Sequence, residues 1–135
     1  MFALPYRARG RVLVRHLVSL RYSRLSDEGF RLGREYRVFI LGEQVVGYGY
    51  YWEGWDELRD LSTEDETVML SLALEAAHRV QVPFLAVDVG QQEDGTWIVI
   101  EVGDAQFAAS GQMERLPLWN KLREAVQSKG ATDAL

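Results

Sequence analysis

The segment that most constrains the fold reads EYRVFIL, then GE, then QVVGYGYYW. Two runs rich in β-branched and aromatic residues flank a Gly-Glu pair, and this arrangement is typical of a tight β-hairpin. We therefore predict strands over residues 35–41 and 44–52, joined by a turn at Gly42 and Glu43. A chain of 135 residues has room for the hairpin and for one complete core around it, but not for two domains.

A helix is predicted after this hairpin. Thr63 and Glu66 have the spacing of a capping box, which places the helix start at Thr63. Apolar residues then recur at helical spacing, which predicts a helix over residues 63–79 with one buried face. The residues expected on that face are Val68, Leu72, Ala76 and Val80, with Met69, Ala73 and Ala77 beside them.

A second hairpin follows the helix. Pro83 ends the helix, and apolar runs over residues 84–89 and 96–102 flank an Asp94-Gly95 turn. Pairing the two strands across this turn places Asp88 directly opposite Glu101.

The remaining segments complete an α+β fold. Residues 10–20 are predicted to form a strand, residues 22–33 a polar loop, and residues 116–127 a short helix followed by a frayed tail over residues 128–135. The predicted architecture is a single domain over residues 1–135. It has an antiparallel sheet of two hairpins plus the N-terminal strand, packed by one or two helices.

Charge and composition exclude several classes of function. Residues 1–37 hold nine Arg and three acids, net +6, and residues 38–135 hold six basic and seventeen acidic residues, net −11, which together give −5. The acidic balance disfavours binding to nucleic acid. The absence of cysteine excludes zinc-cluster, iron-sulfur and thiol chemistry. Without a long apolar stretch or a secretion signal, the chain is expected to be cytoplasmic and free of membrane spans.

Acidic residues on the second hairpin suggest a metal site. Two carboxylates on adjacent strands repel each other unless a cation lies between them, and magnesium held by carboxylate and phosphate oxygens would meet that need. Asp104 follows Glu101 by three positions and could add a further oxygen. The alternative is that Asp88 and Glu101 are two solvated acids on an exposed sheet face.

A second polar group lies on the first hairpin. Glu35 and Arg37 are two residues apart and share a face, with Arg15 on the preceding predicted strand within reach. They form either an ordinary ion pair or an arginine and carboxylate pair that orients a phosphorylated ligand. The aromatic residues from Tyr48 to Trp55 are expected in the core or at an interface.

The order of these elements resembles a known family. REYRVFILGEQVVGYGYYW, followed after a helix by VPFLAVDVGQQEDGTWIVIEVGDAQFAASG, is similar to the C-terminal half of an ATP-grasp domain. The nearest pattern is that of the clade named for one arginine and two lysines. The resemblance covers residues 11–122 and implies a nucleotide-binding and magnesium-binding module related to ATP-dependent ligases. Such ligases activate a carboxylate as an acyl phosphate and transfer it to an amine or thiol.

The resemblance also implies roles for individual residues. His16 and Val18 would lie near adenine, Glu35 would bind the ribose, and Arg15 and Arg37 would face the phosphates, with Arg37 in the catalytic role. Asp88 and Glu101 would hold magnesium. Gly103 stands where the family usually has Asn, and Asp104 follows it as a substitute oxygen donor.

Two interpretations of the whole chain follow. The resemblance implies that catalysis needs a lysine-bearing half, which is absent from this sequence and would come from a partner chain or another segment. The alternative is a non-catalytic remnant that dimerises through an apolar surface, for which the aromatic residues from Tyr48 to Trp55 are candidates.

Overall fold

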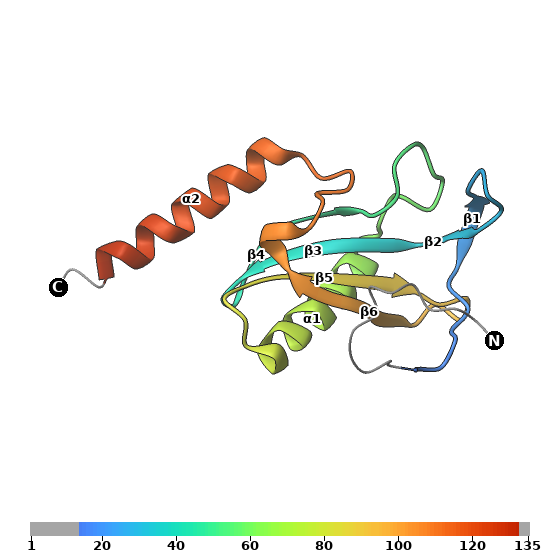
Figure 1. The fold of residues 1–135 in the computed structure, drawn as a ribbon, viewed down its shortest axis with the longest axis horizontal. Coiled ribbons are helices and arrows are strands. Elements are labelled where there is room, and N and C mark those ends of the chain that lie inside the picture. The colour runs from blue at the N-terminus through green and yellow to red at the C-terminus, as the bar shows by residue number, and fades with distance from the viewer. Residues whose placement is uncertain (1–13, 133–135) are drawn as a thin grey trace, which may run out of the picture.

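The computed structural model describes residues 14–132 and shows an α+β fold, as predicted (Figure 1). Its main sheet is antiparallel, with strand order β4-β3-β5-β6. The elements of this sheet and its helices are β3 (Glu35–Leu41), β4 (Gln44–Tyr50), α1 (Thr63–Val80), β5 (Phe84–Gln91), β6 (Trp97–Asp104), the short 3-10 helix η1 (Ala105–Phe107) and α2 (Arg115–Thr132).

The first hairpin, β3 and β4, is confirmed at its predicted position. Gly42 has a φ of 61°, a conformation that glycine adopts without strain at the first central position of a two-residue turn. The strands pair from Tyr36 with Tyr50 to Leu41 with Gln44, with one irregularity between Phe39 and Ile40.

Helix α1 covers one face of the sheet and forms the main core with it. Ser62 is the N-cap, because its hydroxyl accepts a hydrogen bond from the Asp65 amide at 3.1 Å, so the cap lies one residue before the predicted Thr63. The buried stripe consists of Met69, Ala73 and Ala77.

The predicted stripe is therefore offset by one residue. Val68 and Val80 are 47% and 40% exposed. Two stripes with four-residue spacing lie side by side in the sequence, and Leu72 and Ala76 of the predicted stripe still pack against the core as partly buried residues.

The second hairpin, β5 and β6, has the predicted register at its centre. Asp88 pairs with Glu101, and an irregularity between Asp88 and Val89 shifts the pairing on the turn side by one residue. Both strands extend two residues beyond their predicted ends, to Gln91 and Asp104.

The N-terminal part differs from the prediction. Residues 14–19 have no regular structure, and Leu20 forms only an isolated bridge with Gln92, while residues 10–13 of the predicted strand lie outside the described residues. A small hairpin, β1 (Tyr22–Leu25) and β2 (Arg31–Gly33), forms in place of the predicted loop. Its strands mix polar and apolar residues, and Leu32 and Gly33 of β2 are buried where the hairpin meets the rest of the protein.

A buried arginine connects this N-terminal hairpin to the rest of the protein. Arg34 follows β2 and is 5% exposed. Its guanidinium donates to Gln91 at 2.5 Å and to Asp65 at 3.0 Å, and also to the Asp60 carbonyl at 2.7 Å. The N-terminus of α1, the end of β5 and the loop before α1 are thus held by one side chain.

The second face of the sheet is only partly covered. The segment 110–113 crosses β4 closely because Gly47 and Gly49 have no side chains there: a Cβ at Gly49 would lie 2.7 Å from the Met113 amide nitrogen. Helix α2 then leads away from the body of the protein (Figure 1) and packs against it through Leu118 and Leu122. It extends five residues beyond its predicted end at Gln127.

Candidate functional site

A row of polar residues crosses the face of the sheet opposite α1. Arg37 on β3 pairs with Asp88 on β5, and Asp88 pairs with Glu101 on β6. Directly paired residues of antiparallel strands place their side chains on the same face. On the other side of β3, Gly49 of β4 pairs with Arg37. The three charged residues singled out from the sequence therefore lie side by side, and a glycine closes the row.

Arg37 and Asp88 form a bidentate ion pair. Nε and one terminal nitrogen of Arg37 each donate to a different oxygen of Asp88, both at 2.7 Å. The side chains are 14% and 6% exposed, so the pair is largely removed from water. Hydrogen bonding to Asp88, which outweighs the effect of burial, raises the already high pKa of Arg37. Arg37 is thus a fixed cation, aligned with a carboxylate.

Two further contacts hold the Arg37 guanidinium. Its other terminal nitrogen donates to the carbonyl oxygen of Ala109 at 3.0 Å, and its central carbon lies 4.8 Å from the centre of the Tyr51 ring. Sequence reasoning identifies neither partner. The sequence pattern groups Tyr51 with an aromatic cluster, and a backbone carbonyl leaves no signal in a sequence.

Glu101 completes the row as an exposed carboxylate. Within residues 14–132 it makes no hydrogen bond or ion pair. Since Arg37 balances the charge of Asp88, Glu101 supplies the unbalanced negative charge of the row. A cation that approaches the sheet there would meet Glu101 first.

Glu35 lies on the same face as Arg37, two residues earlier on β3 and opposite Gly90. Burial, and secondly the negative charge of Asp88, raise the pKa of Glu35 to about 7, while hydrogen bonding to the Trp52 indole lowers it by less. The indole nitrogen also donates to the Gly33 carbonyl at 2.9 Å. Glu35 is therefore a carboxyl group that changes charge near neutral pH beside the Arg37 and Asp88 pair.

Asp104 does not join the other carboxylates. It is three residues from Glu101 along one strand, so its side chain leaves the opposite face, and it pairs with Leu85 of the α1-side core. Its carboxylate accepts from the Gln106 amide at 3.0 Å and caps η1. Within residues 14–132, no three His, Cys, Asp or Glu side chains are close enough to hold a metal by themselves.

The predicted adenine and phosphate residues of the N-terminal segment lie in irregular chain. Arg15 and His16 are exposed, Val18 is half-buried, and none of them makes a side-chain hydrogen bond or ion pair within the described residues. The segment then reaches the sheet at Leu20, whose side chain would lie 3.0 Å from a Cβ on Gly90. It therefore approaches the Glu35 end of the polar face, but Arg15 is not brought into contact with Glu35 or Arg37.

An apolar hollow lies on the same face, next to the charged row. Its volume is about 520 Å³, and Phe39, two residues beyond Arg37 on β3, contributes to its wall with Phe84 of β5. Helix α2 closes it with Leu118 and Trp119. A flat apolar group and a neighbouring anion could thus both be accommodated on this face.

The aromatic residues proposed for an interface are mostly engaged within the protein. The hydroxyls of Tyr48 and Tyr50 donate to Glu66 and Asp56 at 2.6 and 2.9 Å, and Tyr51 and Trp52 contact each other edge to face. Trp55 alone of the set is largely exposed, at 78%. These residues therefore do not form a continuous apolar surface.

Comparison with known families identifies the domain. A family model matches residues 2–122, and it describes family 3 of the ATP-grasp clade that is named for one arginine and two lysines. The chain belongs to this ATP-grasp family. The family match covers the β3-β4 hairpin, α1, the β5-β6 hairpin and the charged row, in the order expected from the sequence.

One solved structure similar to this ATP-grasp chain is that of the ligase PsnB, complexed with a minimal precursor, Mg and ADP. The two chains share 20% sequence identity, with a TM-score of 0.43, and the similarity covers 68% of this chain and 33% of PsnB. The ATP-grasp chain thus aligns with about a third of the length of that protein. No curated protein matches it in sequence. Among the described residues, no helix is both long and apolar enough to cross a membrane.

Proposed function

We propose that this ATP-grasp domain binds a magnesium nucleotide on the open face of its sheet and serves an ATP-dependent carboxylate ligase. The observation that supports the proposal is the row formed by Arg37, Asp88 and Glu101. It combines a fixed cation for phosphate with the exposed carboxylate of Glu101 for a metal, and Asp88 lies between them on the face opposite α1. Membership of the ATP-grasp family is in accord with this chemistry.

The carboxylates suit magnesium. Magnesium is commonly bound by one or two carboxylates, with phosphate and water oxygens at its remaining positions, so three acidic side chains are not needed. Glu101 is available to a metal, whereas both oxygens of Asp88 accept hydrogen bonds from Arg37. When bound, the metal would neutralise phosphate charge during phosphoryl transfer. Asp104 is left out of the proposed metal set because it lies on the other face and caps η1.

The other proposed roles follow from position. Arg37 would bind the nucleotide phosphates and stabilise the charge that develops on them, since its guanidinium is fixed by three partners in advance. Glu35 would accept hydrogen bonds from ribose hydroxyls. Arg15, His16 and Val18 would approach the nucleotide from the segment that enters at Leu20. We infer that catalysis would also need a lysine-bearing subdomain opposite this face, from a partner chain or another segment.

Isothermal titration with ATP and magnesium tests the proposal. The wild type should bind, and Glu101→Gln should lose most of the magnesium dependence because it removes a charged metal ligand. Glu28→Gln is the matched control, since Glu28 is an exposed acid in the turn between β1 and β2. Absence of any nucleotide binding by the wild type at millimolar concentration would overturn the proposal.

Gly103→Asn offers a gain-of-function test. Gly103 lies on the same face as Glu101, and no atom lies within 4 Å of a Cβ built on it. An asparagine therefore fits without displacing its neighbours and would add an amide oxygen beside Glu101. We expect tighter magnesium-dependent nucleotide binding, by roughly threefold to tenfold. Unchanged affinity in a folded Gly103→Asn variant would argue against a metal at this position.

A further inference from the structure

The outer edge of β4 carries unpaired backbone groups. β4 is the last strand on its side of the sheet. The Tyr51 amide donates a hydrogen bond to the Glu35 carbonyl at 2.9 Å, so Glu35 and Tyr51 form a hydrogen-bonded pair. From there, hydrogen-bonded and non-hydrogen-bonded pairs alternate along β3 and β4. By this alternation Gly49 bonds to Arg37, while the N–H and C=O of Tyr48 point away from β3. Within residues 14–132, those Tyr48 groups have no backbone partner on the outer side.

The neighbouring position shows that this edge can bind more chain. The carbonyl of Tyr50 accepts a hydrogen bond from the Gln112 amide at 3.0 Å. This single contact covers one end of β4 and leaves the stretch from Val45 to Tyr48 free of such bonds among the described residues. An exposed strand edge of this kind is a template for a further strand.

A groove follows the free edge. Three adjoining hollows of about 470, 550 and 310 Å³ run along β4, from Tyr50 at one end to Gln44 at the other. The first two share Tyr48 and Glu66, and the last two share Val45, Val46 and Lys121. One wall is lined by residues 59–61 before α1 and by Glu66 and Leu70 in its first turns, and the other by residues 112–114 and by α2.

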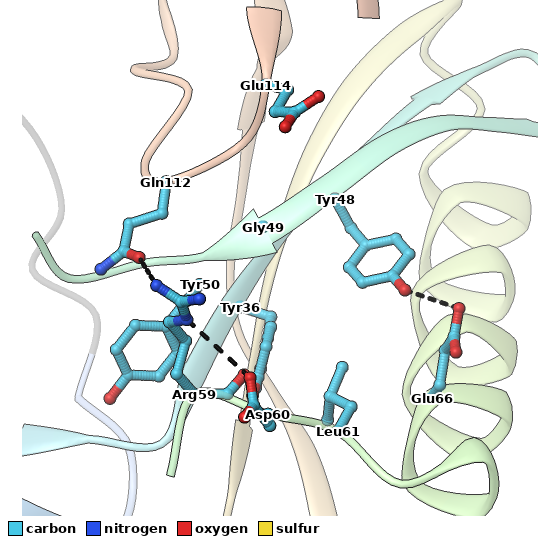
Figure 2. A pocket seen from close by; sticks show the side chains of 10 residues that line it. All are labelled: Tyr36, Tyr48, Gly49, Tyr50, Arg59, Asp60, Leu61, Glu66, Gln112 and Glu114. Carbon is cyan, nitrogen blue, oxygen red and sulfur yellow. Dashed lines mark hydrogen bonds and ion pairs between the residues drawn. The ribbon is translucent and has the colours of Figure 1, made fainter. Parts of the chain in front are cut away.

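Figure 2 shows the Tyr50 end of this groove. Tyr48 extends from β4 toward α1 and donates to Glu66 at 2.6 Å. Arg59 crosses the end of the groove toward Gln112, with 3.3 Å between donor and acceptor. The edge of β4 thus lies between two sets of polar side chains, with Glu66 on the α1 side and Gln112 on the other.

The walls of the groove are mainly acidic. Their carboxylates are Asp60, Glu66, Glu114 and Glu124, against the two cations Arg59 and Lys121. A second copy of this chain that paired through its own β4 would bring two acidic sets together, which disfavours that dimer. Nucleic acid is disfavoured for the same reason.

We infer that this groove binds an extended, basic segment of a partner protein as an additional strand on β4. The free backbone groups of the edge would supply hydrogen bonds that do not depend on the partner's sequence. The added strand would point its side chains alternately toward α1 and toward α2, where basic residues meet Glu66 or Asp60 on one side and Glu114 or Glu124 on the other. The groove follows the β4 edge of the sheet, whereas the Arg37 row lies on a face of the sheet, so the inference does not depend on the proposed nucleotide site.

The test uses a synthetic peptide as long as the seven residues of β4, with the sequence Lys-Lys-Val-Val-Lys-Lys-Val, which places lysines on both faces of an added strand. Amide NMR spectra of the full chain should show shifts at Val46, Tyr48 and Tyr50 on titration. The Tyr48 amide should exchange quickly with solvent in the free protein and slowly in the complex. A matched peptide with N-methyl groups on alternate residues, and one with glutamate in place of lysine, should both bind at least about tenfold more weakly.

Protein variants separate the groove from general charge effects. Glu114→Lys combined with Glu124→Lys reverses two exposed groove charges and should weaken the lysine peptide by roughly tenfold. Glu28→Lys, an exposed change far from β4 in sequence and outside the groove, should alter binding by less than about twofold. A Tyr48 amide already protected in the free protein, or equal binding of the N-methylated peptide, would overturn the inference. Loss of nucleotide binding in Glu101→Gln leaves these outcomes unaffected.

Discussion

At the scale of single residues, the protein positions its charged groups through pairs formed across strands and loops. Arg37 and Asp88 neutralise each other on the open face, while Glu35 beside them is held in an environment that disfavours its charge. Asp56, in the loop before α1, accepts hydrogen bonds from four different residues. These residues determine how the protein responds to pH and to substitution.

Glu35 should make the stability of the protein fall as the pH rises through the neutral range. Its pKa is about 7 in the folded protein and 4.5 as an isolated group, so between these values the folded state holds a proton that the unfolded state has lost. The stability that this group contributes is therefore fully present below about pH 4.5 and is lost as the pH rises to about 7. Glu35→Gln removes the effect, and urea unfolding at about pH 5 and about pH 8 measures it.

We expect the free energy of unfolding of the wild type, relative to Glu35→Gln, to decrease by roughly 1–3 kcal/mol between those two pH values. Because Glu35 is partly exposed, screening by water brings the expected change toward the lower part of that range. Glu28→Gln, at an exposed position, should show no such difference. A parallel pH dependence of wild type and Glu35→Gln would contradict the assigned pKa.

Asp56 should be costly to replace. Its side chain is fully buried and accepts from the Ser23 hydroxyl at 2.5 Å, Arg24 Nε at 3.0 Å, the Tyr50 hydroxyl at 2.9 Å and the Leu58 amide at 2.8 Å. Burial alone would raise its pKa, but these hydrogen bonds outweigh burial and lower the pKa below 3.8. The stability from Asp56 is thus present above about pH 4 and is lost as the pH falls through its lowered pKa.

Asp56→Asn should lower the free energy of unfolding by roughly 2–4 kcal/mol at neutral pH. The amide keeps the shape of the side chain but replaces an acceptor oxygen with a donor that faces other donors. Asp27→Asn is the control, because Asp27 is exposed in the turn between β1 and β2. Chemical unfolding curves of the three proteins make the comparison, and a loss below about 0.5 kcal/mol for Asp56→Asn would contradict the role assigned to it.

At the scale of elements, close approach between backbones explains the two alternating glycines of β4. A Cβ on Gly49 would meet the Met113 nitrogen at 2.7 Å and its Cα at 2.9 Å, and both atoms belong to the backbone that crosses the strand. A glycine in a strand usually weakens it, so its presence at such a position indicates a requirement for space. The same crossing segment provides the Ala109 carbonyl that holds Arg37.

Gly49→Ala should therefore lower the free energy of unfolding by roughly 1–3 kcal/mol, because the backbone at Met113 must move to make room. Gly103→Ala is the matched change, since Gly103 also lies in a strand but its Cβ would have no neighbour within 4 Å. That substitution should be neutral or stabilising by up to about 1 kcal/mol. Thermal unfolding of both variants decides the point, and equal effects would show that glycine entropy, not contact with Met113, dominates.

At the scale of the whole molecule, the sheet and α1 form a compact body, and α2 leads away from it. The body is closed by the core around Val38, Ile40, Val87 and Met69, all fully buried. Helix α2 contributes mainly Leu118 to buried structure, while Leu116, Trp119 and Val126 are between 61% and 72% exposed. Local stability should decrease in the same order.

Hydrogen exchange should reveal this gradient. Amides of β3 and β5, the two central strands, should exchange only through global unfolding, whereas amides of residues 123–128 in α2 should exchange through local fraying, at least about a hundredfold faster. The measurement is made at low protein concentration, so that contacts between copies do not contribute. Protection of residues 123–128 equal to that of β3 would contradict the prediction and would indicate a further contact for α2.

Local sequence patterns were sufficient for the two hairpins, for the position of α1 and for the pairing of Asp88 with Glu101. Strand periodicity, a Gly-Glu turn and an Asp-Gly turn specify these features through interactions between residues near each other in the chain. The α+β class and the ATP-grasp family followed from the same elements in order. The placement of Asp104 on the other face was also contained in its odd spacing from Glu101.

Only the tertiary structure decided which stripe of α1 is buried, that residues 22–33 form a hairpin, and that Arg37 and Asp88 form a bidentate ion pair. Each of these depends on contacts between residues far apart in the chain. The sheet packs against Met69 of α1, and Arg34, which follows β2, donates to Gln91 of β5. Arg37 donates a further hydrogen bond to the Ala109 carbonyl. Periodicity states which residues can share a face. It does not state which partner comes to cover that face, because that is determined by the packing of the complete chain.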